Sequence, residues 1–146
     1  MRLFEPRRHN ATTKHKEMYE PLSERENQLA TIVVDIAFSL NRALGPGLLE
    51  SVYESCFCYE LDQRNIPYQT QQLVPIEYKG LVVEAALRLD ILIDELLIVE
   101  LKAQDNHHPV WEAQLLSYLK LTGNRIGYIV NFHVPLMKEG LKRLII

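Results

Sequence analysis

Between residues 68 and 103 the chain runs through three strand-like segments that are separated by only two short polar turns. The segments cover about residues 68–78, 81–93 and 96–103, and Lys79-Gly80 and Asp94-Glu95 supply the turns. Connections this short can join only antiparallel neighbours, because a parallel connection needs a crossover of about a dozen residues or more. The sequence therefore predicts a three-stranded antiparallel meander.

Apolar residues at helical spacing lie on both sides of this meander. The first helix is expected from about Glu26, after an N-cap at Ser23, to the Gly45-Pro46-Gly47 turn. Further helices are expected over about residues 48–64, 110–121 and 136–144, and an aliphatic strand over 125–132. Since a helix precedes that last strand, the strand is expected to join the sheet in parallel. We predict an α/β fold whose mixed four-stranded sheet, a three-strand meander plus one parallel strand, is flanked by helices.

The second helix is expected to bury one side against the sheet. Its predicted buried face consists of Leu49, Val52, Tyr53, Cys56, Phe57 and Leu61. Cys56 and Cys58 point about 200° apart on a helix, so they are expected to stay reduced rather than to bridge or to share a metal.

Charge is distributed unevenly along the 146 residues. Residues 1–23 show no apolar period and are expected to form a mobile basic arm, whereas residues 24–146 form one domain. The chain carries a net charge of −3, so it is not a general polyanion binder, although the basic arm can flank an acidic site. We find no apolar run of the roughly 20 residues that a membrane helix needs and no secretory leader, and we expect a cytoplasmic protein with no membrane partner.

Three ionisable residues interrupt the aliphatic strands: Asp90, Glu100 and Lys102. Glu100 and Lys102 are two residues apart on one strand and therefore share a face of the sheet. A two-residue turn at Asp94-Glu95 would set Asp90 opposite Val99, whereas a three-residue loop sets it opposite Glu100. We predict the longer loop, or a β-bulge with the same effect. Burying these charges together is costly unless a divalent cation compensates them.

Two helices contribute further polar pairs. Gln114 and Tyr118 are four residues apart and would offer an amide and a hydroxyl to a phosphate or a nucleobase, or form a structural polar pair. Glu50 and Tyr53 lie in the first turn of the second helix. Glu50 either completes a metal shell, directly or through water, or stabilises the positive end of the helix. For Tyr53, packing is favoured over substrate contact.

Four other residues near this constellation have a functional and a structural interpretation. Arg88 can bind phosphate or balance the carboxylates. His107 and His108, in the loop after Lys102, can contact substrate or be solvated. Trp111 favours core packing over base stacking.

Several sequence motifs occur in an order that resembles a known family. They are Gly47-Leu48-Leu49-Glu50-Ser51-Val52-Tyr53, Arg88-Leu89-Asp90, Ile98-Val99-Glu100-Leu101-Lys102-Ala103, the run from Glu112 to Leu119, and the run from Asn131 to Leu136. With these motifs the chain resembles the GxxExxY family of the PD-(D/E)XK nuclease superfamily over about residues 26–146. The resemblance implies a restriction-endonuclease-like core that holds Mg²⁺ or Mn²⁺ with Asp90 and Glu100, and with the main-chain carbonyl of Leu101, beside Lys102.

The leading functional prediction is a divalent-metal-dependent nuclease that hydrolyses phosphodiester bonds of DNA or RNA. The alternative is a non-catalytic nucleic-acid-binding or protein-interaction module on the same scaffold, and a third option is hydrolysis of another phosphoester, such as a nucleotide. A homodimer is also considered, with Leu144-Ile145-Ile146 as a contributor.

Overall fold

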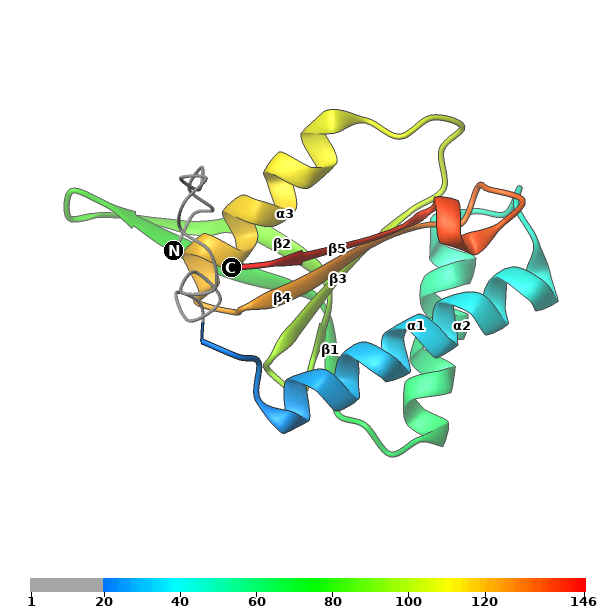
Figure 1. Ribbon diagram of the computed structural model, residues 1–146. Coiled ribbons are helices and arrows are strands. Elements are labelled where there is room, and N and C mark those ends of the chain that lie inside the picture. Colours follow the sequence, from blue (N-terminus) through cyan, green and yellow to red (C-terminus); the bar gives the residue numbers. More distant parts are fainter. Residues whose placement is uncertain (1–19) are drawn as a thin grey trace, which may run out of the picture.

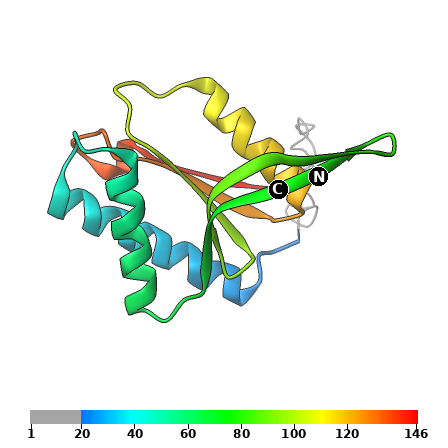
Figure 2. The same cartoon turned by 180° about the vertical axis from the view of Figure 1, so that it is seen from behind.

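The computed structural model describes residues 20–146 and has three layers (Figure 1). A five-stranded sheet of order β1-β2-β3-β4-β5 forms the middle layer. Helix α3 covers one face of the sheet, and α1 and α2 cover the other, as the view from behind also shows (Figure 2). The elements are α1 (Glu24–Leu44), α2 (Glu50–Gln63), β1 (Tyr68–Tyr78), β2 (Leu81–Ile93), β3 (Leu97–Lys102), α3 (Pro109–Thr122), β4 (Ile126–Asn131), the 3₁₀ helix η2 (Met137–Glu139) and β5 (Leu141–Ile145).

The strand pairing follows the predicted order. β1, β2 and β3 form an antiparallel meander, and β4 adds to β3 in parallel after the α3 crossover. The predicted α/β class, meander and parallel strand are therefore confirmed. β5 then pairs with β4 in the antiparallel direction.

The terminal helix predicted over residues 136–144 is wrong. The chain makes one turn of 3₁₀ helix and then the fifth strand, so the sheet has five strands rather than four. Leu141 packs with the cluster on the α1 and α2 face, whereas Leu144 and Ile146 pack with the cluster under α3. Opposite faces for residues three apart are the alternation of a strand, whereas a helix would put them on one side.

The core lies on both faces of the sheet, with the fully buried strand β4 between them. Odd-numbered residues of β3 face α1 and α2, and Ile98 faces α3. The buried cluster on the α1 and α2 side includes Leu29, Val33, Ile36, Tyr53, Phe57, Leu61, Leu97, Val99 and Leu101. The smaller cluster on the α3 side includes Leu89, Leu92, Ile98, Trp111, Leu115, Leu119 and Ile129. Because β3 is covered on both faces, any charged residue at its end is drawn into a partly dry environment.

The two N-terminal helices end where the sequence indicates, but the buried face predicted for α2 needs a correction. α1 begins at a capping box formed by Ser23 and Glu26 and ends at Gly45, as predicted. The predicted buried face of α2 is partly wrong, because Leu49 is 73% exposed and Val52 is also exposed. Leu49 is the N-cap and precedes the helix, so the buried stripe starts only at Tyr53.

The β1–β2 hairpin extends well past the body of the molecule (Figures 1 and 2). We call residues 76–83, around the Lys79-Gly80 turn, the distal hairpin. Its cross-strand pairs Ile76–Val83 and Tyr78–Leu81 share one face, because pairs two residues along a ladder point the same way. Tyr78 and Leu81 are 61% and 62% exposed, so this apolar face is open to solvent.

Most of the expected basic arm, residues 1–19, lies outside the described residues. The Arg125 guanidinium donates hydrogen bonds to the carbonyls of Glu20 and Pro21, just before α1. Both cysteines are free, as predicted. Within residues 20–146 no helix is long and apolar enough to cross a membrane.

Candidate active site

The connection between β2 and β3 fixes the position of the first acidic residue. It has three residues, Asp94 to Leu96, between the paired residues Ile93 and Leu97. Asp94 and Glu95 adopt positive φ values of 50° and 60°, which makes the turn tight. The predicted three-residue loop is confirmed, and its register brings Asp90 opposite Glu100.

Where β2 and β3 separate, the two carboxylates accept the hydrogen bonds of backbone N–H groups in place of main-chain carbonyls. The β2–β3 ladder ends at the pair Ile91–Val99. Beyond it, the Asp90 N–H donates to Glu100 Oε2 at 3.0 Å, and the Leu101 N–H donates to Asp90 Oδ2 at 2.9 Å. Each acid is thus fixed by the other residue's strand, which holds two carboxylates close together.

The carbonyl of Leu101 belongs to the same opening. The Lys102 carbonyl accepts a hydrogen bond from the Phe132 N–H, so this residue pairs with β4. Since successive residues of a strand point their N–H and C=O groups to opposite neighbours, the Leu101 carbonyl points toward β2 and Asp90. Its N–H, which donates to Asp90, confirms that direction.

Glu100 is the most perturbed carboxyl of the site. It is only 5% exposed, although it lies on the polar end of β3. Burial raises the pKa of Glu100 to about 8, and the charge of Asp90 adds to this effect. The Asp90 N–H and the Lys102 ammonium act in the opposite direction without cancelling it. The site therefore holds negative charge that the protein compensates only in part.

Lys102 lies on the same face of β3 as Glu100 and reaches toward α3. Its Nζ lies 5.4 Å from the ring centroid of Trp111, a distance typical of a cation–π interaction. The His107 ring packs edge-on against the same Trp111 ring, with 5.1 Å between the two centroids. Trp111 is buried, as its packing interpretation predicts, and it also provides a surface for the Lys102 ammonium.

Glu50, the first residue of α2, faces the same group of charges. Partial burial raises the pKa of Glu50, and the charge of Asp90 raises it further. The Lys102 ammonium and a hydrogen bond with the Ala103 backbone lower it. Glu50 is thus in electrostatic contact with the carboxylates, and it contacts the first residue after β3.

Tyr53 lies inside the core and organises the loop that precedes Glu50. Its hydroxyl donates to the Gly45 carbonyl at 2.6 Å and accepts from the Leu48 N–H at 3.2 Å. Its ring stacks on Phe132, with centroids 4.4 Å apart. This position fits the packing role of Tyr53 rather than a contact with substrate.

Helix α3 brings Tyr118 to the carboxylates. Burial raises the pKa of the Tyr118 hydroxyl, and the charge of Glu100 raises it further. The Gln114 side chain, by hydrogen bonding, and the charge of Arg88 lower it. Gln114 and Arg88 are exposed, so both are open to a bound molecule while they remain beside Tyr118.

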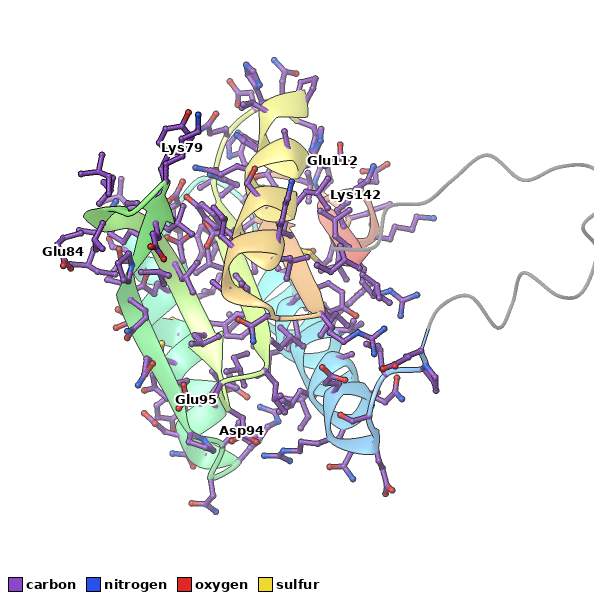
Figure 3. The ribbon with its side chains drawn as sticks, turned by 90° about the vertical axis from the view of Figure 1, so that its left-hand side faces the viewer. Lys79, Glu84, Asp94, Glu95, Glu112 and Lys142 are labelled. Atoms are coloured by element: carbon purple, nitrogen blue, oxygen red, sulfur yellow. The ribbon has the colours of Figure 1, made fainter. Side chains whose placement is uncertain are left out.

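The loop after β3 places its histidines at the start of α3. The His108 ring caps the helix by accepting from the Val110 N–H. His107 Nε2 lies 3.1 Å from a Glu112 carboxylate oxygen, and Lys142 of β5 lies 3.4 Å from the other oxygen. Figure 3 shows Glu112 and Lys142 side by side across α3 and β5. The loop is therefore tied to α3 rather than free in solvent.

Two residues of the site were not assigned a role from the sequence. Asn131 is only 4% exposed, and its side chain bonds both the N–H and the carbonyl of Gln104. It also accepts from the N–H of His133, whose ring lies 2.6 Å from Asp105. The available signal was the run Asn131-Phe132-His133 directly after an aliphatic strand, where polar residues often line a site.

The donor atoms fit a hard divalent cation. Asp90, Glu100 and the Leu101 carbonyl offer only oxygen ligands, which Mg²⁺ and Mn²⁺ prefer. Burial, with the charge of Asp90 added, raises the pKa of Glu100, and a cation bound beside this carboxyl would favour its ionised form. Among the described residues, no group of three or more His, Cys, Asp or Glu side chains could surround an ion. The remaining ligands of an ion here would be waters, one of which could be held by Glu50.

Comparison with known protein families gave a match over most of the chain. A family model described as the PD-(D/E)XK nuclease superfamily matches residues 27–144. Neither a search of the curated proteins nor a search of the solved structures gave a significant match.

Proposed function

The chain belongs to the PD-(D/E)XK nuclease superfamily, and from this membership we propose that it is a divalent-metal-dependent nuclease acting on DNA or RNA. The proposal includes membership of the GxxExxY branch, which rests on the motif from Gly47 to Tyr53. That motif has a physical basis here: Gly47 adopts a φ of +107°, Tyr53 ties the loop, and Glu50 faces the acids.

One observation carries the proposal. The β2–β3 register sets Asp90 opposite Glu100, and each carboxylate is held by the backbone of the facing strand. Burial and the nearby charge of Asp90 disfavour the ionised form of Glu100, and a purely structural role would be served better by a neutral residue. The cost of the two acids to folding is explained if they bind a cation.

Asp90, Glu100 and the Leu101 carbonyl would hold Mg²⁺ or Mn²⁺, with Glu50 completing the shell through water. When bound, such a cation makes water a better nucleophile and offsets negative charge on the phosphate. The two acidic residues would hold it where β2 and β3 separate.

Lys102 is the cation that the chain itself provides. Its ammonium lies over Trp111 and next to Glu100, where it can orient the attacking water or stabilise negative charge that develops on the phosphate. In this proposal the Trp111 ring limits where that ammonium can go.

The remaining polar residues would contact the substrate. Gln114 and Tyr118 would offer an amide and a hydroxyl from α3 to a phosphate next to the carboxylates. Arg88, on β2, would pair with a further phosphate. His107 and His108 would contact the strand on the side of the loop after β3.

The proposal extends to the whole chain. Residues 24–146 would form the nuclease domain, and the basic residues of the segment 1–23 would add attraction for a polyanion. We also propose a homodimer and a cytoplasmic location, the latter supported by two free cysteines, which persist in a reducing compartment.

A cleavage screen tests this function. Purified protein with Mn²⁺ or Mg²⁺ is incubated with single-stranded DNA, duplex DNA, RNA and free nucleotides. We expect chain cleavage that EDTA abolishes and that Glu100→Gln and Lys102→Ala reduce by at least 100-fold. Gln69→Ala, on the exposed surface of β1 near the Asp94 turn, is the matched control and should retain full activity.

The same screen separates the alternatives. Binding of nucleic acid without cleavage at any metal concentration would favour a non-catalytic module, for which the small number of acidic ligands is a supporting observation. Cleavage of nucleotides alone would indicate a different phosphoester substrate. If the protein neither binds nor cleaves any of these substrates, the proposed function is contradicted.

A further inference from the structure

A polar pocket of about 500 Å³ opens beside the candidate active site. It lies between the loop that follows β3 and the first residues after β4. Its lining consists of Ala103, Gln104, Asp105, Asn106, His107, His108 and His133. This volume exceeds what a single nucleobase requires, and the lining offers imidazole and amide groups rather than an aliphatic surface.

The two walls of the pocket are held together by one buried side chain. The Asn131 Oδ1 accepts from the N–H groups of Gln104 and His133 at 3.2 and 3.1 Å. Its Nδ2 donates to the Gln104 carbonyl at 3.0 Å. Because all these bonds form within the protein, the pocket exists before any ligand binds and little ordering is required on binding.

Imidazole groups accompany the carboxylates around the pocket. His133 is paired with Asp105 at 2.6 Å, and His107 with Glu112 at 3.1 Å. A phosphate subsite would need an excess of positive charge or several free donors, whereas here the only carboxylate in the lining is paired with an imidazole. Planar rings and amides without an excess of positive charge suit a nucleobase, which combines flat faces with hydrogen-bonding edges.

Ala103 connects this pocket to the carboxylates. It lines the pocket and directly follows Lys102, and its backbone forms the hydrogen bond with Glu50. A strand with one phosphate at Asp90 and Glu100 would therefore have a neighbouring nucleotide at the mouth of the pocket.

We propose that this pocket binds an unpaired nucleobase next to the scissile phosphate, so that the substrate is single-stranded nucleic acid. The inference rests on the proposed function and names its substrate class. A base inside a duplex has to leave its partner and its stack before it can enter a pocket of this kind. Single-stranded DNA or RNA, or a frayed end, presents such a base without that cost.

Binding measurements in the Glu100→Gln background test the proposal without cleavage. Fluorescence anisotropy compares a labelled single-stranded oligonucleotide, an abasic oligonucleotide of equal length and a blunt duplex, with Mg²⁺ present. The abasic strand keeps the phosphates and lacks the bases. We expect the single strand to bind about tenfold more tightly than either the abasic strand or the duplex, in line with the contribution of one stacked base.

Variants of the pocket identify where that preference arises. His133→Ala should weaken binding of the normal strand about tenfold and leave binding of the abasic strand unchanged. The variant and the abasic strand each remove the contact between His133 and the base, so combining them has no further effect. Asp105→Ala/His133→Ala removes both partners of the ion pair and should bind as weakly as the single variant. Gln69→Ala is the control, and thermal melting checks that each variant is folded.

Each outcome decides between the proposals. Equal binding of normal and abasic strands, or no effect of His133→Ala, overturns the base pocket and leaves the nuclease proposal intact. Recovery of binding in the double variant means that the pocket acts through charge, which also overturns the base pocket. If no oligonucleotide binds and the wild-type protein cleaves none, both proposals fail.

Discussion

Glu100 shows at the level of one residue why the site is costly to the fold. A carboxyl with a folded-state pKa of about 8, above its ordinary 4.5, is more easily protonated in the folded chain than in the unfolded chain. The contribution of Glu100 to the free energy of unfolding is therefore fully present below pH 4.5 and is lost as the pH rises through about 8. A residue that lowers stability at neutral pH, in a strand where Gln would fit, is typical of a site retained for binding.

Replacing this carboxyl should stabilise the metal-free protein. In EDTA at pH 9, we expect Glu100→Gln to melt at a higher temperature than the wild type and to be more stable by about 1–3 kcal/mol, because the variant no longer buries a carboxylate beside Asp90. The difference should shrink toward zero near pH 4. Thermal melts followed by circular dichroism across this pH range provide the measurement.

Glu112→Gln is the matched control, with the opposite sign. The hydrogen bond with His107 lowers the pKa of Glu112, so its carboxylate contributes stability above pH 4.5 that is lost as the pH falls below it. Glu112→Gln should thus be less stable than the wild type at pH 7 and equal to it at low pH. If Glu100→Gln were destabilising at pH 9, the assigned cost of burying the Glu100 carboxylate beside Asp90 would be incorrect.

Trp111 gives a direct optical probe of the site, since it is the one tryptophan of the sequence. It lies 5.4 Å from the Lys102 ammonium. We expect Mn²⁺ or Mg²⁺ to change its fluorescence and to raise the unfolding free energy by about 2.7 kcal/mol at 100 times the dissociation constant. Asp90→Asn should abolish both effects, whereas Lys102→Met should change the metal-free emission itself. A metal response that survives in Asp90→Asn would place the ion elsewhere.

Individual site residues were predictable where their spacing along one strand specified which face of the sheet their side chains share. The spacing of Glu100 and Lys102 gives a shared strand face, and the requirement that Asp90 meet them led to the three-residue loop that the structure contains. Asn131 and His133 were not assigned, because their role depends on a contact with a loop 27 residues earlier in the chain, as the Asn131–Gln104 bonds show. Sequence periodicity carries no information on such contacts.

At the level of elements, the last strand shows the limit of local patterns. Leu141 and Leu144 fit a helix and a strand equally well, and a segment of five residues is too short for the period to decide. The outcome depends on β4, whose outer edge would otherwise be unpaired. The longer elements had clear caps or turns, such as the Ser23 capping box and the Lys79-Gly80 turn, and were predicted correctly.

Gly140 is the residue that allows β5 to start. A Cβ at this position would overlap the Asn131 carbonyl and lie 2.9 Å from Val134 Cγ2, although the φ of −106° is allowed for any residue. Gly140→Ala should therefore push β5 away from β4 and cost about 1–3 kcal/mol in urea unfolding. Lys138→Ala, on the exposed side of η2, should change stability by less than about 0.5 kcal/mol. Equal stability of the two variants would mean that the close approach of Gly140 does not hold β5 in place.

For the whole molecule, the distal hairpin is the feature that the three-layer body does not explain. A two-stranded ribbon alone is at best marginally stable in water, and this one exposes Tyr78 and Leu81 on a single face (Figure 1). Residues 76–83 contain one acid and one base, so no net charge opposes contact between two copies. The predicted contribution of the C-terminus to a dimer is less favourable, because Leu144 and Ile146 pack against the α3-side cluster.

We therefore expect the proposed homodimer to form through this apolar face of the hairpin. Light scattering at about 50–100 μM should give twice the chain mass of 17.0 kDa for the wild type and the monomer mass for Leu81→Asp, because a charge would be buried without a partner. Val82→Asp is the matched control: Val82 is the next residue along the strand, is comparably exposed and points to the opposite face, so this variant should remain dimeric. A monomeric wild type would contradict the dimer, and dissociation by both variants would show that the interface is not confined to one face.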